Sequence, residues 1–303
     1  MKKIVFYYYN EKAFGSIHYE LCKYLFGHGI DGVVLAWNRA YSIEEMNELD
    51  SVTDLFVTNP DGYHWMVEKY NIPSDKIVIV AHALLDLHQL IEARGIVAFD
   101  RPKAFAVVSD FLRDETKKLG IKRTPQVLRM GINVERYTVK PPAKLTTVGF
   151  AGTFHRSDPH TEYDLKRGQL VEAAAQSAGL QFKVAEYYHN SFVTMAGFYA
   201  SVDCVIVAST EEGAGLPMME AAAAGRLTIG TPVGYYVADG AASGGVVVPI
   251  EQADFLREVH EALIYYKNHP AAFQKKCAEI QRYAHQHYDW AQHIKPWVKL
   301  LSS

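Results

Sequence analysis

Two carboxylates and two glycines stand close together in segment 204–220, where a strand is expected to end and a helix to begin. The apolar run 204–208 predicts a buried strand, and Pro217 suits the first position of the helix that follows it. The turn between them presents backbone N–H groups of a helix N-terminus, an arrangement that binds anions. Gly213 and Gly215 let a ligand approach the backbone closely. The segment therefore predicts an anion-binding turn.

Glu212 and Glu220 flank this turn and lie eight residues apart in the sequence. A carboxylate beside an anion site is unfavourable unless it accepts hydrogen bonds from neutral hydroxyl groups. A ligand that carries both phosphates and many hydroxyls, such as a nucleotide sugar, satisfies both requirements. We therefore expect a nucleotide-sugar site at segment 212–220.

The elements that must position this site alternate between short β-branched runs and amphipathic stretches, the pattern of βαβ units around parallel sheets. Helices are expected over 16–26, 110–119 with Asp110 as N-cap, 166–178, 191–200, 217–224 and from 254 onward, with breaks at Pro270 and near Trp290. Strands are expected over 4–9, 32–37, 55–58, 76–80, 104–108, 126–128, 146–151, 181–184, 204–209, 227–230 and 245–248.

The proline pair at 141–142 predicts a domain boundary, because proline continues neither a strand nor a helix there. The expected organisation is an N-terminal domain over 1–140, a second domain over 141–288 and a C-terminal helix over 289–303 that returns toward the first domain. The fold class is α/β, with two Rossmann-like domains facing a cleft and a helical tail.

The segment 212–220 resembles a known motif: two glutamates separated by seven residues, found in retaining glycosyltransferases of the GT-B fold, family four (glycosyl transferases group 1). The residues that carry the resemblance are Glu212-Gly213-x-Gly215-Leu216-Pro217-x-x-Glu220. Runs 108–112, 129–133, 195–203, 221–234 and 289–290 are also similar to the family's conserved segments. The resemblance spans most of the chain and is strongest in its second half, so it implies a GT-B architecture.

In that family the matching residues bind the nucleotide-sugar donor. The resemblance implies that Glu212 contacts hydroxyls of the transferred sugar and that Glu220 holds the ribose hydroxyls. The backbone at Gly213, Gly215 and Leu216 would cradle the sugar and the phosphates.

An arginine and a lysine normally grip the diphosphate in this family, after the first strand of the second domain. Thr153 stands where many members have the arginine. Lys166 is the first candidate for the diphosphate ligand, and Arg167 and Arg156 compete for the second place.

The N-terminal domain supplies two further expectations. Gly15 and Ser16 follow the first strand as the family's glycine loop does, near the donor phosphate and the acceptor. His82 follows the strand 76–80, where the family often places a histidine that faces the reacting sugar. Together with Glu212, His82 is therefore the expected catalytic residue.

The charge balance and the remaining motifs indicate which classes of partner the protein can bind. The net charge is −3, without the basic surplus typical of nucleic-acid binding. Lys117, Lys118, Lys122 and Arg123 form a basic cluster, either solvated or a dock for an anionic lipid or a charged acceptor. No Asp-x-Asp triplet and no metal-type histidine spacing is present, so neither a metal nor another cofactor is expected. Three scattered cysteines and the lack of an apolar run of membrane-spanning length indicate a cytoplasmic protein, with peripheral membrane contact as an option.

The function expected from these features is transfer of a sugar from a nucleotide-diphosphate sugar to an acceptor hydroxyl of a polysaccharide or a lipid-linked glycan. Three alternatives stay open. A dinucleotide-dependent oxidoreductase has a third glycine where this chain has Met218. A nucleotide-sugar epimerase shares the architecture but not the reaction. A non-catalytic nucleotide-sugar-binding relative would fit the missing arginine at Thr153.

Overall fold

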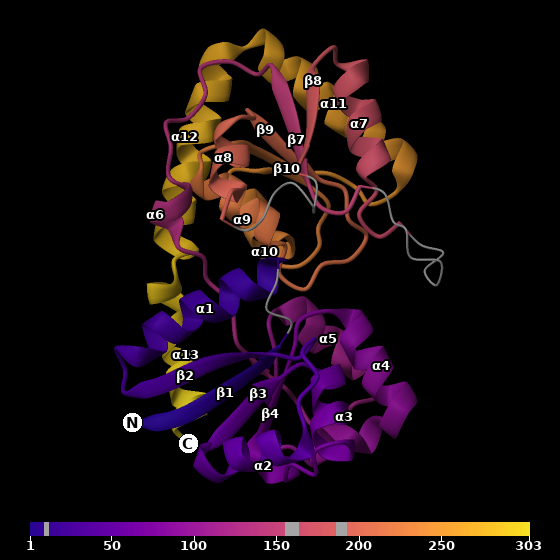
Figure 1. Ribbon diagram of the computed structural model, residues 1–303. Coiled ribbons are helices and arrows are strands. Elements are labelled where there is room, and N and C mark those ends of the chain that lie inside the picture. Colours follow the sequence, from indigo (N-terminus) through magenta and orange to yellow (C-terminus); the bar gives the residue numbers. More distant parts are fainter. Residues whose placement is uncertain (9–11, 155–163, 186–192) are drawn as a thin grey trace. The chain divides into compact units, whose positions relative to one another are not determined.

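The computed structural model of the protein describes residues 1–8, 12–154, 164–185 and 193–303 (Figure 1). The chain divides into two compact units. The first contains Met1–Gly131 together with Trp290–Ser303, and the second contains Ile132–Asp289. Each is an α/β unit built around a parallel sheet, so the expected fold class is confirmed.

The first sheet has six strands in the described part of the chain, in the order β2-β1-β3-β4-β5-β6, and all its pairings are parallel. The strands are β1 (Lys2–Tyr8), β2 (Ile30–Ala36), β3 (Leu55–Thr58), β4 (Ile77–Ala81), β5 (Ala104–Val107) and β6 (Gln126–Val127). The helices of this unit are α1 (Lys12–Phe26), α2 (Ile43–Val52), α3 (Pro60–Glu68), α4 (Leu84–Arg94), α5 (Asp110–Lys118) and α13 (Trp290–Ser302), with two 3-10 turns, η1 (Ser74–Lys76) and η2 (Ile96–Asp100).

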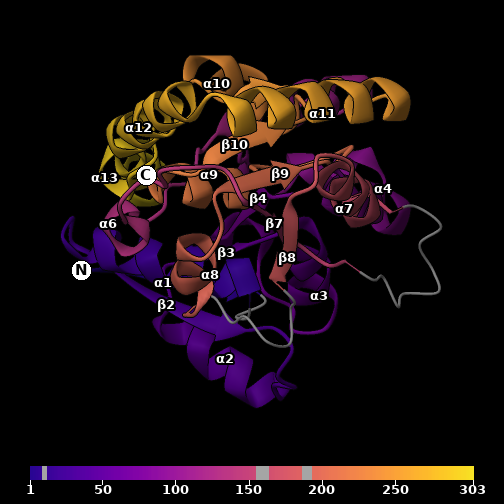
Figure 2. The same cartoon turned by 90° about the horizontal axis from the view of Figure 1, so that it is seen from above.

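The second sheet has five strands among the described residues, in the order β11-β10-β9-β7-β8, again all parallel. The strands are β7 (Thr147–Ala151), β8 (Gln181–Ala185), β9 (Cys204–Val207), β10 (Leu227–Gly230) and β11 (Val246–Val247). The helices are α6 (Val134–Tyr137), α7 (Gly168–Ser177), α8 (Met195–Ala200), α9 (Leu216–Ala223), α10 (Tyr236–Ala242), α11 (Gln252–Asn268) and α12 (Pro270–His287). Figure 2 shows the two long helices of this unit; α11 packs on α7 and α12 packs on α9.

The central strands are buried along their whole length because helices connect parallel neighbours and cover the sheet. The apolar runs of β4 and β9 are completely buried, as the β-branched pattern predicted. The last helix, α13, belongs to the first unit, where it packs on α1 (Figure 1). Trp297 on this helix is fully buried, and its indole Nε1 donates to the Arg129 carbonyl at 3.0 Å.

The break between the units falls at Gly131–Ile132, so the proline pair 141–142 lies inside the second unit. The segment before the prolines contains α6, which packs on α8 and α9. Packing of this short helix assigns the segment to the second unit, and the stiffness of the prolines does not mark that division.

Three local expectations need correction. Ser109, not Asp110, caps α5, and its Oγ accepts from the Leu112 N–H at 3.3 Å. The helix expected from residue 166 begins at Gly168, because Arg167 adopts a left-handed backbone with φ of 49°. Gly15 and Ser16 lie inside α1 and not in a glycine loop. The segment that joins β1 to α1, residues 9–11, lies outside the described residues.

Candidate donor site of the second unit

The strand order of the second sheet determines where a ligand can bind. β7 lies between β8 and β9, so the chain runs to one side of β7 with β8 and to the other side with β9, β10 and β11. In such open sheets ligands bind outside the carboxyl ends of the strands at this switch point. The segments that follow β7 and β9 meet there: the Thr210 N–H donates to the Leu165 carbonyl at 3.0 Å. The turn singled out in the sequence is therefore at the position where the topology places a site.

The turn before α9 is held by the segment that follows β10. The Tyr235 N–H donates to the Ala214 carbonyl at 3.0 Å, and a Cβ on Gly234 would approach the same oxygen to 2.6 Å. Gly215 is the N-cap of α9 with φ of 85°, and no described atom lies within 4 Å of the position of a Cβ there. The helix begins at Leu216, so the N-terminus of α9 is presented beside open space.

The carboxylate of Glu212 has two donors. Ser209 Oγ donates to Glu212 Oε1 at 2.7 Å, and Lys166 Nζ forms an ion pair with the same oxygen. The Glu212 side chain is 14% exposed, whereas that of Lys166 is 39% exposed, so the lysine is the more accessible partner. The structure thus joins the two residues that the sequence assigned to the sugar and to the diphosphate.

The Arg167 side chain donates hydrogen bonds to backbone carbonyls of the second unit. Its Nε donates to the Ala208 carbonyl at 2.5 Å and its Nη1 to the Ile250 carbonyl at 2.6 Å. Its guanidinium lies over the Phe255 ring at 5.3 Å, and burial lowers the pKa of the group. Lys166 therefore has the more available cationic side chain of the two. Arg156, the third candidate, lies outside the described residues.

Glu220 lies on α9 and is held by two tyrosines. Tyr137 Oη donates to Glu220 Oε1 at 2.8 Å, and Tyr199 Oη donates to Glu220 Oε2 at 2.7 Å. Burial raises the pKa of the Glu220 carboxyl, while the two tyrosine hydroxyls act in the opposite direction.

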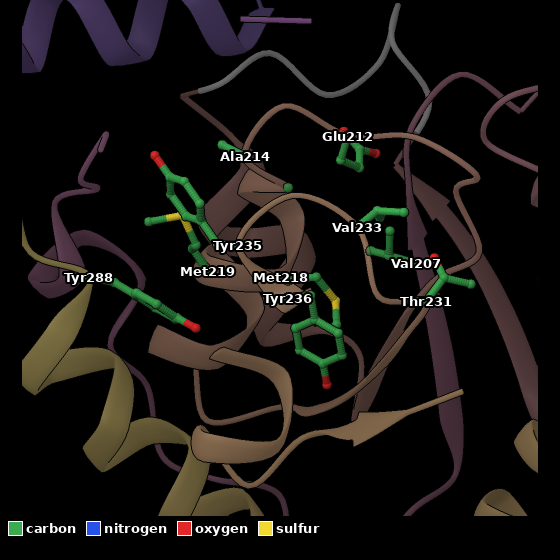
Figure 3. A pocket seen from close by; sticks show the side chains of 11 residues that line it. Val207, Glu212, Ala214, Met218, Met219, Thr231, Val233, Tyr235, Tyr236 and Tyr288 are labelled. Atoms are coloured by element: carbon green, nitrogen blue, oxygen red, sulfur yellow. The ribbon is translucent and has the colours of Figure 1, made fainter. Parts of the chain in front are cut away.

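A pocket lies beside the turn (Figure 3). Met218 and Tyr236 form part of its apolar floor together with Val207, and Glu212 lies on the turn itself. The pocket is lined by Val207, Glu212, Ala214, Gly215, Met218, Met219, Thr231, Val233, Tyr235, Tyr236 and Tyr288. Its volume of about 10 Å³ is close to that of a single water, so it is a small, mostly apolar recess beside the turn.

His82 lies in the first unit, directly after β4. It is 6% exposed, and its ring lies 5.3 Å from the Tyr8 ring and 5.6 Å from the His18 ring. Burial, followed by the neighbouring His18, lowers the pKa of His82 well below its usual value, so its imidazole is neutral at neutral pH. Its backbone N–H donates to Asp86 Oδ2 at 3.0 Å, which fixes the start of α4.

The basic cluster 117–123 is largely neutralised. Lys117 pairs with Asp114 at 2.9 Å, and Lys118 pairs with Glu115 at 2.6 Å. Arg123 donates to backbone carbonyls at 99, 100, 102 and 103. Among the described residues, no hydrogen-bond or ion-pair partner is recorded for Lys122, the fourth cation.

The described residues contain neither a cluster of metal-binding side chains nor a membrane-spanning helix. Within ranges 1–8, 12–154, 164–185 and 193–303, no three metal-binding side chains come together as a metal site. No helix of these ranges is long and apolar enough to span a bilayer.

Four residues at these positions escaped the sequence analysis: Ser209 beside Glu212, Tyr137 and Tyr199 on Glu220, and His18 beside His82. Only Ser209 has a local signal, a hydroxyl at the end of the strand before the turn. The other three come from elements distant in sequence from their partners.

The second unit matches a known family. Residues 140–264 match the model described as "Glycosyl transferases group 1", which confirms the resemblance seen at segment 212–220. No curated protein sequence matches the chain significantly.

The whole chain resembles solved glycosyltransferase structures at low identity. HepE of Anabaena, solved with UDP and glucose, is 12% identical with a TM-score of 0.70, and 100% of each chain is covered. Sucrose-phosphate synthase of Thermosynechococcus elongatus is 15% identical with a TM-score of 0.69, over 100% of this chain and 98% of that one. A variant of TarM from S. aureus is 12% identical with a TM-score of 0.65, over 86% of this chain and 58% of that one. The fold is therefore GT-B, as the resemblance predicted.

Proposed function

We propose that the protein is a retaining glycosyltransferase that moves a sugar from a nucleoside-diphosphate sugar to an acceptor hydroxyl without a metal ion. One observation carries the proposal: Lys166, Glu212 and the N-terminus of α9 converge at the switch point of the second sheet, within the segment that matches the family. HepE, with the same fold, has been solved with UDP-glucose. Retention follows from the resemblance of segment 212–220.

In this mechanism each residue acts on a different part of the donor, according to its charge. As the bond between the anomeric carbon and the diphosphate oxygen breaks, negative charge grows on the diphosphate, where Lys166 and the α9 N-terminus stabilise it. Glu212 accepts hydrogen bonds from sugar hydroxyls and orients the ring. The acceptor oxygen bonds to the anomeric carbon on the face that the diphosphate leaves, and its proton passes to the departing phosphate oxygen. The neutral imidazole of His82 would face the reacting sugar as a hydrogen-bonding group.

The acceptor we propose is a polysaccharide or a lipid-linked glycan. A TarM variant of S. aureus has been solved with UDP, fondaparinux and alpha-GlcNAc-glycerol, two of which are glycan compounds. We place the enzyme in the cytoplasm because its three cysteines are unpaired. The proposal does not extend to a membrane contact, since most cations of the basic cluster 117–123 already have partners.

The deciding experiment incubates the protein with a panel of nucleotide sugars and analyses the products. A transferase releases the nucleoside diphosphate from its donor, with an added acceptor or with water as the acceptor. An epimerase changes the sugar and retains the nucleotide, whereas a binding protein changes neither. Inversion of the anomeric configuration in the product would refute the retaining mechanism.

Metal independence has its own test. Because no metal ligand takes part in this account, donor turnover should be unchanged in excess EDTA. Loss of turnover that manganese or magnesium restores would contradict this part of the proposal.

A further inference from the structure

The second unit has a groove that is separate from the recess beside the turn. It is lined by six residues of α11 and by Val246 of β11, the last strand of the sheet, and its volume is about 460 Å³. None of these residues lines the recess at Glu212. Small-molecule sites have volumes of about 300–1,000 Å³, so the groove is large enough for such a ligand. We define it as the α11 groove.

The α11 groove presents one exposed aromatic residue, Tyr265. This residue is 49% exposed, although the His269 ring stacks on its ring with centroids 4.5 Å apart. The buried Tyr266 packs against it edge to face at 5.1 Å. His269 is itself fixed, because its Nδ1 donates to the Tyr265 carbonyl at 2.7 Å. These neighbours hold the Tyr265 ring in place, so little side-chain entropy is lost when a ligand stacks on it.

Charged side chains lie beside this ring on the same face of the helix. Glu258, Glu261 and Tyr265 are three and four residues apart, the spacing of neighbours on a helix surface. Arg257 is oriented by Asp254, which it contacts at 2.5 Å, and by Glu258 at 3.3 Å. The carboxylates accept hydrogen bonds, whereas the guanidinium donates them. The groove therefore offers acceptors and a donor around an aromatic ring.

The charge of the α11 groove restricts the class of ligand. Its lining contains two glutamates and one arginine, so negative groups outnumber positive ones. A negative surface repels phosphates and carboxylates, which disfavours nucleotides and anionic lipids. An apolar peptide needs more apolar surface than one exposed ring and the half-buried Val246 supply. A neutral ligand with many hydroxyls fits the lining best.

A pyranose ring combines these properties. One of its faces carries C–H groups, which an aromatic ring shields from water, and its rim carries hydroxyls that both donate and accept. Glu258 and Glu261 would accept from these hydroxyls, and Arg257 would donate to their oxygen atoms. We propose that the α11 groove is a second carbohydrate site, which binds a pyranose unit of a neutral glycan by stacking on Tyr265.

The choice of a glycan rests on the proposed function, because the acceptor proposed there is a glycan. The inference goes beyond that function by adding a site at which no bond is made or broken. An acceptor long enough to reach both sites would be held at two points and so bind more tightly than a short one.

Calorimetry with neutral hexasaccharides tests the α11 groove. The probes are maltohexaose, cellohexaose and laminarihexaose, and the variants are Tyr265→Ala, Tyr265→Phe and Glu261→Gln. Phe26→Ala is the control, since Phe26 is also an exposed aromatic residue in the last turn of a helix, α1 of the first unit. Tyr265 and Glu261 are exposed, so these changes leave the fold intact, and thermal unfolding checks this.

The wild-type protein should bind at least one of the three hexasaccharides. Tyr265→Ala should weaken this binding about three- to tenfold, because the stacked ring is lost, whereas Tyr265→Phe and Phe26→Ala should bind as the wild type does. Glu261→Gln should weaken it about two- to fivefold, because a charged acceptor becomes a neutral one. Release of nucleoside diphosphate from the donor to water should be equal in all variants, since the groove shares no residue with the turn.

Failure of all three hexasaccharides to bind, or equal binding by Tyr265→Ala and the wild type, would overturn the inference. It would also be overturned if hexalysine bound in a Tyr265-dependent manner and the hexasaccharides did not, because the groove would then take a cationic peptide. Tyr265-dependent hexasaccharide binding without nucleoside-diphosphate release from any donor would instead contradict the proposed function alone. The two failures are therefore distinguishable.

Discussion

At the scale of single residues, Lys166 and Glu212 form an ion pair with each other. In the proposed function Lys166 would contact a phosphate of the donor, and Glu212 would contact hydroxyls of the donor sugar. Donor binding would therefore replace the ion pair between these two side chains by contacts to the donor. This exchange would link recognition of the diphosphate to release of Glu212 for the sugar.

Replacing Lys166 by alanine should weaken nucleoside-diphosphate binding about tenfold, because one charge-assisted hydrogen bond to the diphosphate is lost. The side chain is 39% exposed, so the lower part of the usual range applies. Calorimetry with the nucleoside diphosphate measures the effect. Lys275→Ala is the control, since this lysine is 80% exposed on α12. Equal binding by both variants would move the role to another cation.

Residue identity could be predicted from the sequence only where neighbours along the chain define the role. The location of Glu212 and Gly215 in a turn between a strand and a helix could be predicted from this local context. The hydrogen bonds of Arg167 could not be predicted, because one of its carbonyl partners, Ile250, lies 83 residues away and is brought near by the fold. The same holds for Tyr137, which is also 83 residues from Glu220.

At the scale of elements, the start of α9 depends on a left-handed glycine. Gly215→Ala should lower the free energy of unfolding by about 1 kcal/mol, because an L side chain is strained at φ of 85° even in open space. Gly197→Ala is the matched control: it lies in α8, also in open space, without a positive φ. There the same substitution should raise the stability by about 0.5–1 kcal/mol. Urea titration measures both, and effects of the same sign would contradict this account of the turn.

The start of α4 depends on Asp86, whose Oδ2 accepts from the N–H groups of His82 and Ala83 at 3.0 and 3.1 Å. Burial raises the pKa of this carboxyl to about 6. Between about pH 4 and pH 6 the folded protein therefore holds a proton that the unfolded chain has released, and this group lowers the stability as the pH rises.

Asp86→Asn does not titrate and keeps an acceptor oxygen, so its stability relative to the wild type should rise by about 2–3 kcal/mol from pH 4 to pH 7. Urea titrations at a series of pH values measure the difference. Asp75→Asn, at an exposed position in η1, should show no such trend. Parallel pH curves for wild type and Asp86→Asn would refute the assignment.

Most elements could be predicted because their apolar patterns are local. The expected strands 55–58 and 227–230 agree with β3 and β10 to the residue, and the breaks near Pro270 and Trp290 are where α12 and α13 begin. The loop at Gly15 was expected from the family resemblance, but α1 begins at Lys12 and includes this glycine, which a helix accepts at modest cost.

At the scale of the whole molecule, both sheets begin with the same strand order, in which the first strand lies between the second and the third. Each unit therefore has its own switch point, after β1 and β3 in the first and after β7 and β9 in the second. The alternation of strands and helices predicted two such units. It did not predict where they divide, because the packing of α6 decides this.

The central claim is that Glu212 acts on the reacting sugar while Glu220 acts on a part of the donor that does not react. Contacts to an unreactive part are equal before and during transfer, so Glu220→Gln should raise KM with little change in kcat. Charge develops at the transferred sugar, so Glu212→Gln should lower kcat about 100-fold. Its binding of the nucleoside diphosphate should not weaken, because Lys166 loses a competing partner.

Steady-state kinetics of nucleoside-diphosphate release from the donor, measured on both glutamine variants, tests this claim most directly. The account predicts a loss of kcat for Glu212→Gln and a rise of KM for Glu220→Gln. If Glu212→Gln raises only KM, as Glu220→Gln does, Glu212 does not act on the reacting sugar and the account is contradicted.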